Sequence, residues 1–73
     1  MAQENVDVPI PGKIISVNVS QGGEIKEGDI ICMLESMKME NPIIAPCNGT
    51  ITKLEVSPGQ VVEAGQLICT IEC

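Results

Sequence analysis

Two stretches of the chain repeat one pattern, GKIISVNVSQGGEIKEGDIICMLE at residues 12–35 and GTITKLEVSPGQVVEAGQLICTIE at residues 49–72. They align without insertion or deletion at a constant offset of 37 residues. Followed outward, the alignment covers about residues 8–35 and 45–72. Agreement over such a length indicates an internal duplication, so the chain consists of two copies of one motif.

Each copy has the pattern of β-strands joined by tight turns. Apolar, mostly β-branched residues alternate with polar ones, which is the period of a half-buried strand. The residues predicted to face inward are Ile15, Val17, Val19, Ile30, Cys32 and Leu34 in the first copy, and Leu54, Val56, Leu67, Cys69 and Ile71 in the second. Sharp turns that need glycine are predicted at Gly22, Gly28, Gly59 and Gly65. No long window has helical periodicity free of Gly or Pro, so we expect an all-β chain whose two similar sheets face each other.

The composition excludes several classes of function. A chain of 73 residues forms one small domain, residues 1–73, with too thin a core for a deep substrate cavity. The absence of His removes the commonest general base and metal ligand, and the absence of aromatic residues removes platforms for stacking nucleic-acid bases. A net charge of −6 repels phosphate backbones and anionic lipids. We therefore expect no catalytic residue, no metal site and no nucleic-acid partner.

Neither a membrane span nor a signal peptide is visible in the sequence. The longest apolar runs have about five residues, and the N-terminus lacks a basic and apolar leader. We therefore expect no membrane insertion and a cytoplasmic location. In a reducing cytoplasm free thiols are the expectation for all the cysteines, which are Cys32, Cys47, Cys69 and Cys73.

The segment that joins the two copies, Glu35 to Ile44, contains the tetrapeptide Ser36-Met37-Lys38-Met39 followed by the turn formers Asn41-Pro42. Apolar runs flank it on both sides, which predicts a hairpin with an outward tip. With this segment at the centre of a duplicated frame, the chain resembles the biotinyl domain, the carrier module of biotin-dependent carboxylases, decarboxylases and transcarboxylases. That domain belongs to the biotinyl/lipoyl attachment superfamily. Further motifs that carry the resemblance are Pro11-Gly12, Gly28-Asp29 and Ile44-Ala45-Pro46.

The resemblance implies a flattened β-barrel or sandwich of two four-stranded antiparallel sheets with quasi-two-fold symmetry. It implies that a biotin protein ligase joins biotin to the ε-amino group of Lys38. Met37 and Met39 would be flanking recognition residues, resting on the domain surface, and Glu35 and Ser36 would frame the hairpin. The domain would be a monomeric, non-catalytic carrier that moves carboxybiotin between a biotin carboxylase or decarboxylase site and a carboxyltransferase site.

Two alternatives remain open at this point. Ser36 stands where biotin carriers most often have Ala, and lipoyl domains often have Ser or Thr two residues before their lysine. A lipoyl or dual biotin/lipoyl carrier, with lipoate on Lys38, is therefore the nearer alternative. Lipoyl domains typically place Asp before the lysine, whereas Met37 stands here, and this favours biotin. The remoter alternative is an unmodified β-barrel interaction module in which Lys38 is an ordinary solvated turn residue.

Overall fold

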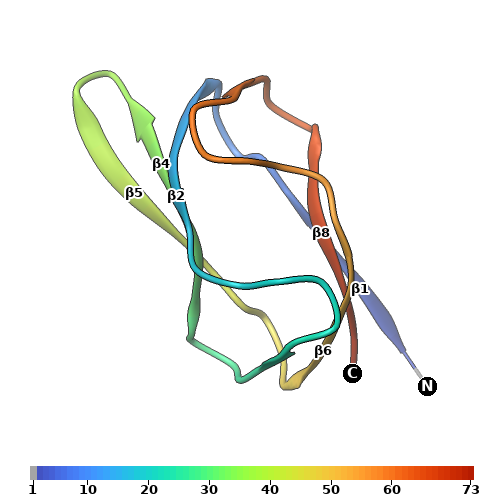
Figure 1. Ribbon diagram of the computed structural model, residues 1–73. Coiled ribbons are helices and arrows are strands. Elements are labelled where there is room, and N and C mark those ends of the chain that lie inside the picture. Colours follow the sequence, from blue (N-terminus) through green and yellow to red (C-terminus); the bar gives the residue numbers. More distant parts are fainter. Residues whose placement is uncertain (1) are drawn as a thin grey trace.

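The computed structural model describes residues 2–73, and Met1, which the predicted domain includes, lies outside them. Over these residues the chain forms two four-stranded antiparallel sheets (Figure 1). The strands are β1 Gln3–Asp7, β2 Gly12–Val17, β3 Glu24–Ile25, β4 Ile30–Ser36, β5 Met39–Ile44, β6 Gly49–Leu54, β7 Val61–Val62 and β8 Leu67–Glu72. The sheet orders are β1-β8-β6-β3 and β5-β4-β2-β7. The predicted all-β class and pair of sheets are confirmed, as a flattened sandwich and not a closed barrel. None of the described residues belongs to a helix long and apolar enough to cross a membrane.

The duplication governs how the strands pair. The register of β1 against β8 repeats that of β5 against β4, so that Asn5 lies opposite Thr70 and Pro42 lies opposite Met33. β1 is therefore the counterpart of β5, a relation that the sequences of these two strands do not reveal. The structural copies are β1–β4 and β5–β8, longer than the copies predicted from the sequence. β1 of the first copy therefore pairs with β8 of the second, and β5 of the second copy pairs with β4 of the first.

The core is built from matched residues, one from each copy. The buried pairs are Val6 and Ile43, Val8 and Ala45, Ile14 and Ile51, Ile25 and Val62, Ile31 and Ile68, Cys32 and Cys69, and Leu34 and Ile71. Burying one large aliphatic side chain of this kind stabilises a fold by about 1.5–3 kcal/mol. Neither sheet could bury its apolar face alone, so the pairing of the copies is what allows a chain of this length to fold.

Two residues predicted to face inward lie outside the core. Ile15 is 41% exposed and Ile30 is 44% exposed, whereas the adjacent Ile14 and Ile31 are buried. The cause is a shift of register just after Ile14 in the β2–β4 pairing and just after Ile30 in the β4–β5 pairing. Such bulges reverse which side chains face inward, and a period-two pattern does not reveal them. The other predicted positions are buried or half-buried, namely Val17, Val19, Cys32, Leu34, Leu54, Val56, Leu67, Cys69 and Ile71.

The prediction that all four cysteines are free thiols is wrong for one pair. Cys32 and Cys69 are free and buried, as predicted, but Cys47 and Cys73 form a disulfide. The two residues are 26 positions apart in sequence, and the fold brings their Cα atoms to 6.3 Å. That distance lies within the range that a disulfide requires. Only the tertiary structure places the turn before β6 beside the end of β8.

The tight turn before the last strand of each copy is bonded to the residue that follows the first strand of the other copy. The N–H of Gly28 donates to the carbonyl of Ala45 (3.0 Å), and the N–H of Gly65 donates to that of Val8 (2.8 Å). Both glycines have φ near +90°, a conformation that a side chain makes costly. Gly22 and Gly59 share it, which confirms the predicted turns.

We expect two glycines to differ in how much a substitution costs. A Cβ at Gly49 would collide with the backbone carbonyl of Glu72 on the neighbouring β8, whereas a Cβ at Gly28 would meet no atom within 4 Å. Gly49→Ala should lower the free energy of unfolding by about 3 kcal/mol because β6 and β8 must separate. Gly28→Ala should lower it by about 1 kcal/mol through backbone strain alone. Urea denaturation followed by far-UV circular dichroism measures both, and equal losses would contradict the close approach of β6 and β8.

Candidate functional site

The connection between β4 and β5 is a two-residue hairpin that contains Lys38. Ser36 and Met39 form the last pair of the ladder, which leaves Met37 and Lys38 as the central residues. Their φ angles are 53° and 64°. Positive φ at both central positions is the requirement of a type I′ turn, whose twist matches that of the flanking strands. The hairpin points outward, as predicted, at the end of the molecule opposite the two termini (Figure 1).

The two central residues of this turn are not of the types that a type I′ turn prefers. Type I′ turns favour Asn and Gly, yet here the positions hold Met37 and Lys38. Among the described residues these two are the only non-glycine residues with positive φ, a conformation that costs roughly 1–2 kcal/mol per residue. The predicted turn formers Asn41 and Pro42 lie instead in β5, an edge strand where proline is tolerated. Strain of this kind is commonly retained at functional sites.

The side chains at the tip extend into solvent. Met37 is 90% exposed and Met39 is 65% exposed, and Lys38 between them is exposed as well. The prediction that the methionines lie outside the core is right, but Met37 contacts too little of the domain to rest on its surface. The reason is that the turn projects beyond the body of the sandwich (Figure 1). The tip therefore presents one amine between two flexible thioethers.

The base of the hairpin, in contrast, is fixed. Ser36 is buried, and its hydroxyl donates a hydrogen bond to the carbonyl of Pro11 at 2.7 Å. This bond ties the end of β4 to the segment that precedes β2. Glu35 is exposed and lies opposite Glu40 on one side and Lys13 on the other. Ser36 thus supports the hairpin through its hydrogen bond to Pro11, whereas Glu35 contributes a negative charge next to the hairpin.

The amine of Lys38 is not engaged by the rest of the domain. Within residues 2–73 the one ion pair joins Lys53 to Glu55, at 3.8 Å. Lys13 and Lys53 lie within β2 and β6, and Lys26 follows β3 in a turn that belongs to the body of the sandwich. Lys38 alone combines exposure with a place on a projecting tip.

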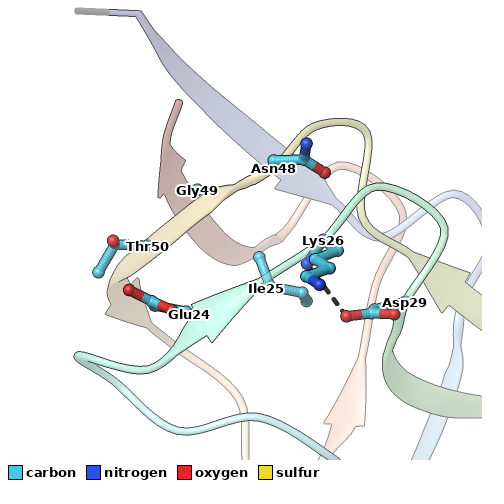
Figure 2. A pocket seen from close by; sticks show the side chains of 7 residues that line it. All are labelled: Glu24, Ile25, Lys26, Asp29, Asn48, Gly49 and Thr50. Atoms are coloured by element: carbon cyan, nitrogen blue, oxygen red, sulfur yellow. Dashed lines mark hydrogen bonds between the residues drawn. The ribbon is translucent and has the colours of Figure 1, made fainter.

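A surface hollow lies beside β3 and β6 (Figure 2). The fold already uses two of the polar side chains that line it. The carboxylate of Asp29 accepts a hydrogen bond from the backbone N–H of Lys26 (3.0 Å), and the amide oxygen of Asn48 accepts one from the N–H of Glu27 (2.7 Å). In the part of the chain that the structure describes, no three His, Cys, Asp or Glu side chains are grouped so as to hold a metal ion. Two of the lining side chains therefore stabilise turns, and the described residues form no metal-binding cluster there.

Comparisons with known proteins agree with this geometry. A family model described as "biotin-requiring enzyme" matches residues 4–71. The gamma subunit of methylmalonyl-CoA decarboxylase from Veillonella parvula is 54% identical over 43 residues, which are 59% of this chain and 33% of that subunit. The gamma subunit of glutaconyl-CoA decarboxylase from Acidaminococcus fermentans is 51% identical over 39 residues, 53% of this chain and 27% of that subunit. The matched region is thus about a third or less of these curated relatives.

A solved structure shares the fold over nearly the whole chain. The urea carboxylase of Kluyveromyces lactis superposes with a TM-score of 0.88 at 26% sequence identity. The superposition covers 99% of this chain and 6% of the carboxylase. The two-sheet sandwich therefore occurs as one small part of a much larger protein.

Relieving the strained turn should stabilise the domain. Met37→Asn combined with Lys38→Gly supplies the residues that a type I′ turn favours, and we expect the free energy of unfolding to rise by about 1–2 kcal/mol. Lys38→Arg keeps a side chain in the strained conformation and is the matched control, with stability unchanged. Urea denaturation compares the three proteins, and a double variant no more stable than the parent would show that the turn is unstrained.

Removing the Ser36 hydroxyl should weaken the base of the hairpin. Ser36→Ala breaks the hydrogen bond to the Pro11 carbonyl, and we expect a loss of about 1 kcal/mol in unfolding free energy. Ser20→Ala changes an exposed loop serine and controls for the substitution itself. Identical midpoints of thermal unfolding for the two variants would argue against a stabilising role for Ser36.

Proposed function

The chain belongs to the family of biotin-requiring enzymes, and from this premise we propose that it is a biotin carboxyl carrier module with biotin on Lys38. Its cofactor is covalent biotin. The observation that carries the assignment to Lys38 is its place on the projecting hairpin, exposed and without an ion pair among the described residues. An amine that must enter the active sites of other proteins needs such a position. Lys38 and its hairpin therefore suit the covalent attachment of biotin.

The chemistry divides between the cofactor and the chain. Biotin supplies a ring nitrogen that accepts and releases a carboxyl group. The neutral amine of Lys38 attacks the carbonyl carbon of an activated biotinyl group in a biotin protein ligase. An amide bond forms, the bond to the activating group breaks, and the nitrogen loses a proton. Ser36 holds the base of the hairpin by its hydrogen bond to the Pro11 carbonyl. The tip holds the attached biotin away from the sandwich.

The distribution of exposed apolar residues supports docking through the sheet that carries Lys38. All of the exposed large apolar side chains of the described chain lie on the β5-β4-β2-β7 sheet or next to its strands, namely Ile10, Ile15, Ile30, Met37, Met39, Ile44 and Val61. At the equivalent positions on the other sheet, Thr52 replaces Ile15 and Asp7 replaces Ile44. Exposed apolar side chains confined to one of the two sheets favour contact of that sheet with another protein.

The partners follow from the carrier role. The first partner is a biotin protein ligase, which attaches the cofactor. The later partners are a biotin carboxylase or decarboxylase and a carboxyltransferase, as subunits or as domains of one chain. The similarity to gamma subunits of two acyl-CoA decarboxylases supports an assembly of this kind. The domain itself catalyses no step. Its contribution is to raise the effective concentration of a tethered group at two separate sites.

Attachment can be tested directly by mass spectrometry. Incubation with biotin, ATP and a biotin protein ligase should add one biotinyl group, and peptide mapping should place it on Lys38. Lys38→Arg should abolish the addition, while Lys13→Arg, which changes an exposed lysine on β2, should leave it intact. A parallel reaction with a lipoyl ligase tests the nearer alternative. Lipoyl addition in place of biotin, or biotin on another lysine, would refute the assignment.

A further inference from the structure

The two-fold relation between the copies has one place, here called the open end, where the chain is not continuous. At the Lys38 hairpin, the last strand of the first copy continues directly into the first strand of the second. At the equivalent place, β8 and β1 are neighbours without a covalent connection, and the N–H of Cys73 donates to the carbonyl of Ala2 at 2.8 Å. Figure 1 shows this open end at the opposite side of the sandwich from the hairpin.

Residues at the same position of the repeat tie both ends to the body. Ser36 is tied to Pro11 by its hydroxyl at the hairpin end. Cys73, which lies 37 residues after Ser36, is tied to Cys47, the residue just before the counterpart of Pro11. The open end therefore has a covalent bond where the closed end has a hydrogen bond.

The turn that holds Cys47 is itself anchored. The N–H of Ala45 donates to the carbonyl of Asp29 (2.9 Å), and the amide oxygen of Asn48 accepts from the N–H of Glu27 (2.7 Å). These bonds join the turn to the one between β3 and β4. The disulfide thus fastens the end of β8 to a fixed support, and it closes residues 47–73 into a ring that includes β6, β7 and β8.

We propose that Cys47 and Cys73 form a thiol-redox site that fastens and releases the open end of the sandwich, independently of the hairpin that carries Lys38. A dithiol reductant opens it by attack of one thiolate on the Sγ of Cys73, which is exposed, while Cys47 is half-buried. The Sγ–Sγ bond breaks, and the Cys47 thiolate leaves and takes up a proton. The second thiol of the reductant then displaces Cys73, so that the chain gains two electrons and two protons and the reductant becomes a cyclic disulfide.

The other two cysteines do not compete in this exchange. Cys32 and Cys69 are fully buried in the core, and burial raises the pKa of the Cys32 thiol. Burial, with a further contribution from the nearby Cys32, raises the pKa of Cys69 to about 11. Since the thiolate is the reactive form, both are inert at neutral pH while the fold persists.

The test compares the oxidised chain with the same chain in dithiothreitol, using far-UV circular dichroism and hydrogen exchange. Reduction should lower the melting temperature by roughly 10 °C or more, since a ring of this size is released. Amide exchange should accelerate at the ends of β1 and β8 and stay unchanged at residues 36–39. In the native reduced protein, iodoacetamide should alkylate Cys47 and Cys73 and spare Cys32 and Cys69.

The matched control is the double variant Cys47→Ser with Cys73→Ser. Its melting temperature should equal that of the reduced parent and should not respond to dithiothreitol. The proposal is overturned if the parent is equally stable with and without dithiothreitol, or if unfolding in denaturant without reductant exposes four titratable thiols. Faster exchange in the hairpin on reduction would overturn the independence of the two ends. None of these readouts requires biotin, so they are separate from the test of Lys38.

Discussion

The two sheets must bury their apolar faces against each other for this chain to fold. A chain of 73 residues has too little apolar surface to build a core from one sheet, and the duplication supplies a second face of the same shape. The two copies are inseparable because each sheet has two central strands from one copy and two edge strands from the other. The repeated register shifts after Ile14 and Ile51 show that even the irregularities are duplicated.

The site follows from this arrangement. Where β4 of one copy continues into β5 of the next, the connection must lie at an end of the sandwich, and a two-residue turn is enough to make it. The strands beneath are held by the core and by the Ser36 hydrogen bond, so the fold can sustain unfavourable φ angles at Met37 and Lys38. Stability is thus concentrated in the body, while the tip is free to meet other proteins.

Most of the architecture could be predicted from the sequence because the two copies align without a gap. The alternating apolar residues and turn glycines indicated the strands and turns, and the apolar runs on both sides of residues 35–44 indicated the hairpin. The β1–β5 equivalence could not be predicted, since strand pairing conserves register and not residue type. The bulges misplaced Ile15 and Ile30 because one extra residue reverses the inward face. The Cys47–Cys73 bond depends on contacts between distant segments, which composition and spacing do not encode.

We propose that Lys38 accepts biotin on a tip whose chemistry is separate from the packed body. The most direct measurement is a pair of ¹H–¹⁵N correlation spectra, recorded before and after treatment with biotin, ATP and a biotin protein ligase. We expect shifts confined to Lys38 and its immediate neighbours in the hairpin, with core amides such as Ile51 and Ile71 unmoved. Shifts centred on another lysine, or spread through both sheets, would contradict this proposal.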